Sequence, residues 1–416
     1  MPNKKILVLC WDFPPNNGIG GRRWAKLTKY LVKLNFECHV IKCAKDLKSK
    51  NSSWTADVQS DNIKVYNIKP YFLTKWLNGT STGFKKIKFF IANKLMPLKF
   101  KGTIYDKAIG IENEIIKTAQ EIIDENQIKY IIVTGAPFNL LFYSAKLLKN
   151  NPQLISLADY RDPWITAVNY GMQGLSPSRK KVEEEKQNFV LNQFTYVSAP
   201  NTFLLKDIEA SYTGQTAIKS KFIEIAHAFD IDDYGNDILL HNSVQKTNTI
   251  KIVYGGAMYL GVENYIQAFS QAIKDYQLTF STKIIEAIFY TEDYKKYETI
   301  YDNLIFKPSV GDNFFKVVKE ADFLLVLLAN HNKDFKTTKY YEYMPINKPY
   351  IYIGPEGFVS DSIKNDQIGY VLSNVSDDFK KIINTENALK RSNSIQELIN
   401  IHSFSNRAEV IKSIFT

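Results

Sequence analysis

The chain has 416 residues, of which 45% are hydrophobic and 23% charged, a composition typical of a globular protein with two or three domains. This composition excludes wholesale disorder, a collagen-like fibre and a low-complexity scaffold. Its 53 basic and 43 acidic residues leave a net charge of +10, which favours polyanionic partners such as nucleotides, phospholipid surfaces or nucleic acid.

The cysteine content and the apolar runs indicate the compartment. Three cysteines are too few for a disulfide framework, which favours a reducing environment. The longest apolar run, at 323–329, is far shorter than the roughly 20 residues that cross a bilayer. Asp12 interrupts the apolar N-terminal run and no cleavage site follows, which argues against a signal peptide. We therefore expect a cytoplasmic protein, either free or peripheral on the inner face of the plasma membrane.

Strands and helices alternate in the first half of the chain. A buried strand at 5–10 is followed by a loop rich in proline and glycine, a helix at 22–34 and a strand at 37–41. This β-α-β order implies a parallel sheet. Further strands are predicted at 64–68, 130–133, 154–158, 196–198 and 222–225, with helices at 113–126, 139–149 and 178–192.

The alternation pauses and then resumes in the second half. Residues 230–249 are polar without a strong period, which predicts a linker. Strands are expected at 250–254, 283–290, 304–308, 323–328 and 350–354, and helices at 265–275, 293–303, 314–320 and 339–344. The sequence thus predicts an α/β protein with two Rossmann-like parallel-sheet domains facing a cleft, at 1–229 and 250–395. One or two closing helices, within 396–416, can pack back on the first domain.

The loop FPPNNGIGGR at 13–22 follows the first strand and opens a helix. Gly20 and Gly21 let a ligand approach the backbone, and Arg22 and Arg23 favour an anion at the helix start. The loop does not match G-x-G-x-x-G, because Arg23 stands at the third glycine. No acid ends the second strand, so a dinucleotide site is disfavoured. The alternative interpretation is a tight turn that needs positive φ.

The segment ADYRDPW directly follows a buried strand. Ligands collect at the carboxyl ends of parallel strands. Arg161 can bind a phosphate there, while Asp159 and Asp162 orient it or accept sugar hydroxyls. A structural ion-pair cluster that holds the loop is the alternative.

Two acids, Asp334 and Glu342, are separated by seven residues after the apolar strand of the second domain. Thr337 and Thr338 are expected to cap the helix that carries Lys339 and Glu342. A helix start can hold a phosphate while a carboxylate one turn on accepts two vicinal hydroxyls. An isolated acid pair is more often a solvated surface feature, but its place in a βα loop favours a site.

These segments resemble the family-4 glycosyltransferases of the GT-B fold, in particular the bacterial surface-polysaccharide type. FPPNNGIGGRRWAKLTKYL is similar to their N-terminal glycine-rich loop and helix, and ADYRDPW to a loop of many bacterial members. TTKYYEYMPINKPYI is similar to the family segment S-K-x-x-E-Y-M-A-x-G-K-P-V. EIAHAFD, which contains His227, resembles the N-G-F-D segment, and IVYGGAMYLG, which contains Gly256, resembles the loop that opens the second domain.

The resemblance implies a hexosyltransferase-like enzyme that moves a sugar from a UDP- or GDP-sugar to a saccharide or lipid-linked saccharide in cell-surface polysaccharide synthesis. It implies retention of configuration, an acceptor domain at 1–229, a nucleotide-sugar domain at 250–395, no metal and no cofactor. Catalytic candidates are then Arg161, Asp162 and Asp334. Donor-binding candidates are Gly20, Gly21, Arg22, Gly256, Thr337, Thr338, Lys339 and Glu342, and acceptor-side or structural candidates are Asp159 and His227.

The chain departs from the family at several points. Asp334 stands at the first position of Glu-x7-Glu, and Glu342, which would bind the ribose hydroxyls, stands at the second. The Arg…Lys pair that binds the diphosphate has no evident match, so Lys339, Arg22 or Arg23 are its candidate substitutes. A sugar-nucleotide epimerase of the same fold and a non-catalytic two-lobed binding protein remain as alternatives.

A basic tract occupies residues 70–102. No acid occurs from 62 to 105, while lysines are frequent and mixed with aromatic residues. One interpretation is a helical excursion whose aromatics pack into the core. The other is an acceptor-side surface facing an anionic membrane. Nucleic acid is not expected as a partner, because the tract has lysine and no arginine.

Overall fold

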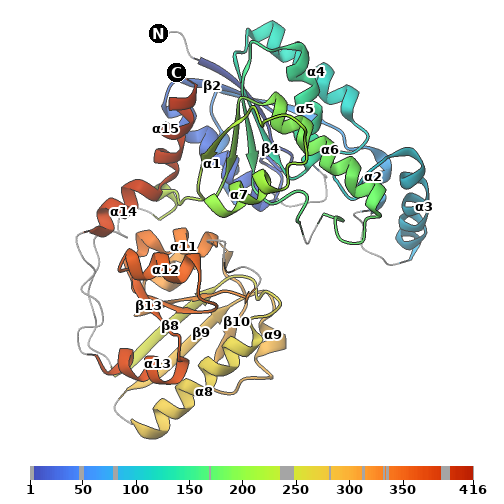
Figure 1. Ribbon diagram of the computed structural model, residues 1–416. Helices are drawn as coiled ribbons and strands as arrows, with labels where there is room; N and C mark the ends of the chain where they lie inside the picture. The colour runs from blue at the N-terminus through green and yellow to red at the C-terminus, as the bar shows by residue number, and fades with distance from the viewer. Residues whose placement is uncertain are drawn as a thin grey trace. The chain divides into compact units, whose positions relative to one another are not determined.

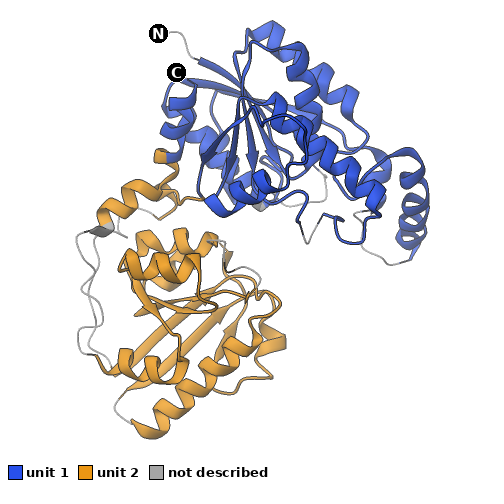
Figure 2. Cartoon of the chain, in the orientation of Figure 1, with its two compact units in different colours: residues 1–226, 407–416 blue, residues 227–406 orange. Residues whose placement is uncertain are grey.

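A computed structural model describes residues 4–45, 51–77, 83–167, 170–234, 248–280, 283–311, 314–330, 333, 337–385 and 394–415. The chain divides into two compact units, shown in different colours in Figure 2. Unit 1 contains residues 1–226 and 407–416, and unit 2 contains residues 227–406. Most of the expected linker at 230–249 lies outside the described residues.

Unit 1 is built on a parallel sheet of seven strands in the order β3-β2-β1-β4-β5-β6-β7 (Figure 1). The strands that follow the first three along the chain join the sheet on the opposite side of β1, so the strand order switches between β1 and β4. In open α/β sheets a ligand crevice forms at this point, beyond the carboxyl ends of the strands. The strands are β1 (Lys4–Leu9), β2 (Phe36–Cys43), β3 (Ile63–Ile68), β4 (Tyr130–Gly135), β5 (Ile155–Tyr160), β6 (Tyr196–Ala199) and β7 (Lys221–Glu224).

Helices cover both faces of this sheet, because strands such as β1 and β4 are buried along almost their whole length and leave no polar face for water. Phe415, near the C-terminus, belongs to unit 1 and lies 5.0 Å from the ring of Tyr130 on β4. The helices are α1 (Ile19–Lys33), α2 (Phe72–Leu77), α3 (Phe84–Lys99), α4 (Glu112–Asn126), α5 (Phe138–Asn150), α6 (Pro177–Gln193), α7 (Thr202–Ala210) and α15 (Phe404–Ile414), of which α15 begins in unit 2.

Unit 2 repeats the plan with six parallel strands in the order β10-β9-β8-β11-β12-β13. Its switch lies between β8 and β11. The strands are β8 (Thr249–Gly255), β9 (Ile284–Tyr290), β10 (Ile305–Lys307), β11 (Phe323–Leu327), β12 (Tyr350–Ile353) and β13 (Gly369–Val371). The helices are α8 (Glu263–Thr279), α9 (Tyr294–Tyr297), α10 (Phe314–Val318), α11 (Thr338–Glu342), α12 (Phe358–Asn365), α13 (Val375–Asn384) and α14 (Ser394–His402).

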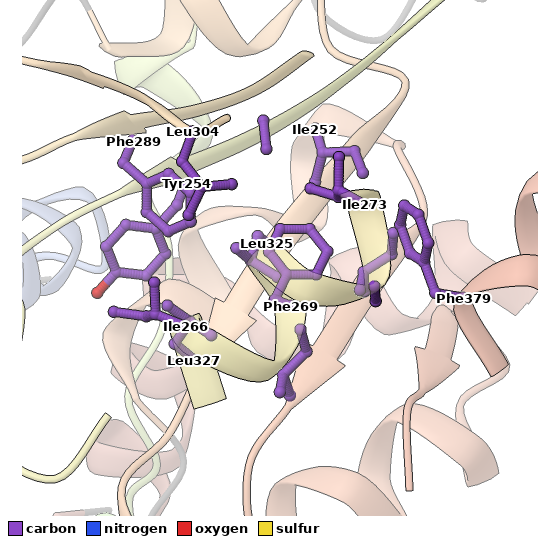
Figure 3. Packing of buried hydrophobic residues seen from close by; sticks show 14 of the residues in the cluster. Ile252, Tyr254, Ile266, Phe269, Ile273, Phe289, Leu304, Leu325, Leu327 and Phe379 are labelled. Carbon is purple, nitrogen blue, oxygen red and sulfur yellow. The ribbon is translucent and has the colours of Figure 1, made fainter. Parts of the chain in front are cut away.

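The core of unit 2 lies where α8 and α13 pack on its sheet (Figure 3). Phe269 and Ile273 of α8 are completely buried, as is Phe379 of α13. The rings of Phe269 and Phe379 meet edge to face with centroids 5.6 Å apart. Leu325 of β11 completes the same cluster, so this packing fixes both helices against the central strands.

The predicted fold class, two Rossmann-like parallel-sheet domains, is confirmed, and each predicted strand is present. The helix predicted at 293–303 is wrong in extent, since α9 ends at Tyr297. Asn303, in a turn after α9, exchanges hydrogen bonds through its side chain with Ser270 on α8, at 2.5 and 2.8 Å. The sequence interpretation also omitted α7, α12, α13 and β13.

We expect Phe269→Ala to lower the free energy of unfolding by about 3–5 kcal/mol, because it leaves a cavity in a fully buried cluster. Leu278→Ala on the same helix is the matched control. Its side chain is 87% exposed, so its effect should stay within about 0.5 kcal/mol. Urea unfolding followed by circular dichroism measures both, and equal losses would contradict this description of the core.

Candidate functional site

Loops from three elements of unit 1 meet at its switch point. The loop after β1 leads through Gly18 into α1, with the Gly21 N–H donating to the Gly18 carbonyl at 2.8 Å. The backbone N–H of Arg161, just after β5, donates to the carbonyl of Gly135 at the end of β4, at 2.9 Å. The glycine-rich loop and the ADYRDPW segment therefore lie at one edge of the sheet.

Gly20 and Gly21 are required by close packing and not by positive φ, so the tight-turn interpretation is wrong. Both lie within the first turn of α1. A Cβ on Gly20 would lie 1.5 Å from Nη1 of Arg161, and a Cβ on Gly21 would lie 1.9 Å from the carbonyl oxygen of Asp12. The absence of side chains here lets the Arg161 guanidinium lie directly against the start of α1.

Arg161, Asp162 and Tyr170 form one polar cluster. Arg161 Nε donates to Asp162 Oδ2 at 3.0 Å, and the Tyr170 hydroxyl donates to the same oxygen at 2.8 Å. Burial raises the pKa of Tyr170 to about 12, and the Asp162 carboxylate adds to that effect. Burial opposes the charge on Arg161, but Asp162 and Tyr170 together raise the pKa of its guanidinium above the ordinary value. Arg161 is therefore a permanent cation in a fixed orientation, with its side chain 18% exposed.

Asp159 lies deeper and is fully buried. Arg23 binds its two oxygens at 3.1 Å each, Trp24 Nε1 donates to it at 2.9 Å, and Ser198 Oγ donates at 2.9 Å. Arg23 also donates to the carbonyls of Ile225 and Ala226, at 2.7 and 3.1 Å. Four of the five guanidinium N–H groups of Arg23 therefore bond within unit 1, and the residue is only 4% exposed, which argues against its expected role as a diphosphate ligand. Arg22, one residue earlier, is only half-buried.

Unit 2 has a second polar cluster at its own switch point. Its β8 ends at Gly255, whose N–H donates to the hydroxyl of Tyr343 at 3.0 Å. Gly256 follows with φ +151°, and a Cβ there would lie 3.1 Å from Cε of Lys339. The positive φ and the close approach of Lys339 both favour glycine at this position. Tyr343 also stacks on the ring of Phe314, with centroids 6.0 Å apart.

Lys339 and Glu342 form an ion pair on α11. Lys339 Nζ donates to Glu342 Oε2 at 2.8 Å and lies 5.3 Å from the centroid of Phe314. Glu342 is only 6% exposed, and the Tyr234 hydroxyl donates to its backbone carbonyl at 2.7 Å. Lys339 thus holds the carboxylate of Glu342, and Tyr234 holds its backbone.

The expected capping by Thr337 is not observed. Thr337 occupies the N-cap position of α11, but its side chain makes no capping hydrogen bond. Its Oγ1 is buried and has no hydrogen-bond partner among the residues that the structure describes. Buried hydroxyls are normally hydrogen-bonded in folded proteins. Thr338 begins α11 and is half-buried.

The two remaining candidates are Asp334 and His227. Asp334 is outside the described residues. His227 belongs to unit 2, with its ring 6.3 Å from that of Tyr341.

A cavity of about 580 Å³ in unit 1, lined by Lys99, Phe142 and other residues, includes none of the candidate residues. In the described part of the chain, no helix is both long and apolar enough to cross a bilayer.

Sequence reasoning missed the aromatic residues that shape both clusters. Tyr170 lies eight residues beyond Asp162, and nothing in the intervening sequence indicates that they meet. For Phe314 the sequence predicts only a place in a helix. Tyr343 directly follows Glu342 in the EYM segment, so its place in the motif was a signal that could have identified it.

No family model and no curated protein matches the chain. Solved structures match it over nearly its entire length. The trehalose-6-phosphate protein of E. coli bound with UDP-2-fluoro glucose has a TM-score of 0.63 at 10% identity, covering 99% of this chain and 98% of that one. A sucrose-phosphate synthase from Thermosynechococcus elongatus has a TM-score of 0.59 at 9% identity with the same coverage. The chain has the GT-B fold.

A third structure with the GT-B fold is HepE of Anabaena in complex with UDP and glucose. It has a TM-score of 0.54 at 14% identity and covers 99% of this chain and 95% of that one. Identities this low establish the fold alone. The predicted GT-B architecture is thus confirmed. Membership of family 4 stays a prediction.

The two glycines at the start of α1 provide a matched pair of variants. Gly20→Ala meets only the far end of the long Arg161 side chain, which can rotate aside without a shift of backbone, so its cost should stay within about 1 kcal/mol. Gly21→Ala meets the backbone of Asp12, which has to move, so a loss of about 2–3 kcal/mol is expected. Urea unfolding measures both variants. A larger loss for Gly20→Ala would contradict the packing described above.

Proposed function

We propose that the chain is a glycosyltransferase that moves a sugar from a UDP- or GDP-sugar to a saccharide or lipid-linked saccharide, in cell-surface polysaccharide synthesis. The observation that carries the proposal is the polar cluster at the switch point of unit 2. There a buried carboxylate (Glu342), a cation (Lys339), a buried hydroxyl without a partner among the described residues (Thr337) and a glycine (Gly256) come together in a GT-B fold.

Each group of this cluster suits one part of a nucleoside diphosphate sugar. In the proposal, Glu342 accepts hydrogen bonds from the two vicinal ribose hydroxyls, which a buried carboxylate does strongly. Lys339 supplies positive charge to the diphosphate, and Thr337 Oγ1 donates to one of its oxygens. Gly256 has no side chain, so in the proposal the ligand approaches the backbone at the end of β8.

The chemical step is departure of the diphosphate from a sugar that develops oxocarbenium character. Negative charge grows on the leaving group, so fixed cations stabilise the transition state more than the ground state. The proposal assigns this role to Arg161, which Asp162 and Tyr170 orient and keep charged. These cations make the proposed reaction independent of a metal. Retention of configuration and a sugar contact by Asp334 rest on the family resemblance.

The test is incubation of the protein with radiolabelled UDP- and GDP-sugars, with and without saccharide acceptors. Transfer, or slow release of the free sugar, is the expected result. An intact nucleotide whose sugar has changed stereochemistry would instead indicate an epimerase. Tight binding without any turnover would indicate a two-lobed binding protein, and either result would overturn the proposal.

Glu342→Gln keeps the shape of the side chain and removes its charge. We expect the affinity for UDP- or GDP-sugar to fall by about 10- to 100-fold, because hydrogen bonds to a charged acceptor contribute about 1.5–3 kcal/mol. Glu320→Gln, an exposed acid of the same unit, is the control and should bind as the wild type does. Calorimetric titration measures both, and an unchanged affinity of Glu342→Gln would show that this residue does not bind the donor.

Arg161→Lys keeps the charge but loses the planar fork of donors. We expect kcat to fall by more than KM for the donor rises, because the charge on the leaving group is greatest in the transition state. Steady-state kinetics separates the two effects. A variant with normal kcat and a lowered melting temperature would assign Arg161 to holding the loop, and not to catalysis.

The acceptor is the less constrained half of the proposal. We assign it to unit 1, as a saccharide or lipid-linked saccharide, with residues 70–102 facing an anionic membrane surface. The absence of any acid from 62 to 105 supports this assignment, because a tract of lysines attracts a negatively charged leaflet. The enzyme would then work as a peripheral protein on the cytoplasmic leaflet.

A further inference from the structure

Helix α3 of unit 1 has two apolar faces, of which only one is covered. On the inner face Ala92 and Met96 are completely buried. They pack with Leu73 and Leu77 of α2 in a small cluster that Ile104 and Ile109 complete. The expectation that the aromatic residues of this tract pack into the core is therefore half right, since Phe89 and Phe100 are also packed against this cluster.

The C-terminal end of α3 is held firmly to α6. Arg179 donates to the carbonyl oxygens of Pro97, Phe100 and Gly102, at 2.6, 3.2 and 2.8 Å. In the segment that follows α3, the buried carboxylate of Glu183 accepts from the Thr103 N–H at 3.1 Å. These contacts fix the helix on unit 1 (Figure 1), so its outer face is presented by a rigid element.

The outer face carries a continuous apolar stripe. Its five members follow one another at intervals of three, four, four and three residues, which places them along one side of the helix. Phe90, 55% exposed, lies at its margin. The stripe consists of Phe84 (85% exposed), Ile87 (56%), Ile91 (42%), Leu95 (46%) and Leu98 (84%). Exposed apolar side chains gathered in this way mark an interaction surface.

The charges on α3 itself are all of one sign. Five lysines lie on α3, at positions 85, 86, 88, 94 and 99, and all are exposed. The nearest acids along the chain are Asp61 and Asp106, and Asp106 is buried where it accepts from the N–H groups of Phe138 and Asn139 at the start of α5. Lys88 lies over the ring of Trp76 and Lys99 over that of Tyr71, at 5.7 and 4.7 Å, so part of the charge is supported by aromatic rings.

We propose that the outer face of α3 docks on an anionic lipid bilayer, with the apolar stripe in the interface and the lysines at the lipid phosphates. The helix has 16 residues and is too short and too charged to span a membrane, so it lies along the surface. A bilayer fits better than a second copy of the chain, because two such faces would bring lysines against lysines. It also fits better than a nucleic acid, which has no place for an aliphatic stripe.

This inference rests on the proposed function for one point. The proposed function explains why the protein would need a surface that docks on a membrane. A transferase whose saccharide acceptor carries a lipid meets that acceptor only at a membrane. The docking surface therefore assigns the acceptor to the lipid-linked class, and it belongs to unit 1, the unit that the proposed function assigns to the acceptor.

Co-sedimentation with vesicles tests the surface. The full chain should bind vesicles of phosphatidylglycerol and phosphatidylcholine far better than vesicles of phosphatidylcholine alone, and salt should weaken the binding. We expect at least a tenfold loss in partitioning for Phe84→Ser combined with Ile87→Ser and Ile91→Ser. A similar loss is expected for Lys86→Glu combined with Lys88→Glu and Lys94→Glu.

Two control variants change the same residue types elsewhere. Leu278→Ser removes an apolar side chain that is 87% exposed on α8, and Lys117→Glu reverses a charge on α4 that is 77% exposed. Both should bind vesicles as the wild type does. Equal binding by the wild type and both triple variants, or none by any of them, would overturn the inference. Self-association that the stripe variant abolishes, without vesicle binding, would assign the face to a second copy and overturn it too.

Nucleotide-sugar binding and hydrolysis, measured without vesicles, separate this inference from the proposed function. Both triple variants should retain the wild-type values, since none of their residues belongs to the candidate site. Donor turnover without vesicle binding would overturn the docking surface alone. Vesicle binding that depends on α3, in a protein that neither binds nor hydrolyses any nucleotide sugar, would confirm the surface and overturn the transferase.

Discussion

A buried ion pair between Arg23 and Asp159 holds unit 1 in the form that its candidate site needs. Burying two charges is costly unless every donor and acceptor is satisfied, and here Trp24, Ser198 and two backbone carbonyls complete the set. The pair ties the first turn of α1 to β5 and to the backbone at 225–226. With that turn fixed, the absence of a side chain at Gly20 leaves a space beside α1, and the guanidinium of Arg161 occupies it.

Unit 2 reaches a comparable arrangement by different means. Its switch point lacks a buried arginine among the described contacts and relies on a lysine and a glutamate one turn apart on the five-residue helix α11. Aromatic side chains hold this short helix: Tyr343 bonds to the end of β8, and Tyr234 bonds to the carbonyl of Glu342. The strand order thus switches once in each sheet, and each unit places a different set of charges at that point.

Local patterns in the sequence predicted the strands well, because a buried parallel strand is a short apolar run that needs no information from distant residues. They failed for β13, which has only three half-buried residues, and for the pairing of Arg23 with Asp159, which are 136 positions apart. Arg22 and Arg23 look equivalent in sequence. They differ in the direction in which each side chain leaves α1, because Arg23 becomes buried and structural while Arg22 stays half-buried. For the same reason, the contact between Gly20 and Arg161 could not be predicted, although both residues had been selected as candidates.

Hydrogen exchange with and without UDP tests most directly whether the switch point of unit 2 binds the nucleotide. The account predicts slower exchange at Gly255 and Gly256 and along 337–342, and no such protection in the Glu342→Gln variant at the same concentration of UDP. Protection confined to other segments, or protection at 337–342 that survives in Glu342→Gln undiminished, would contradict it.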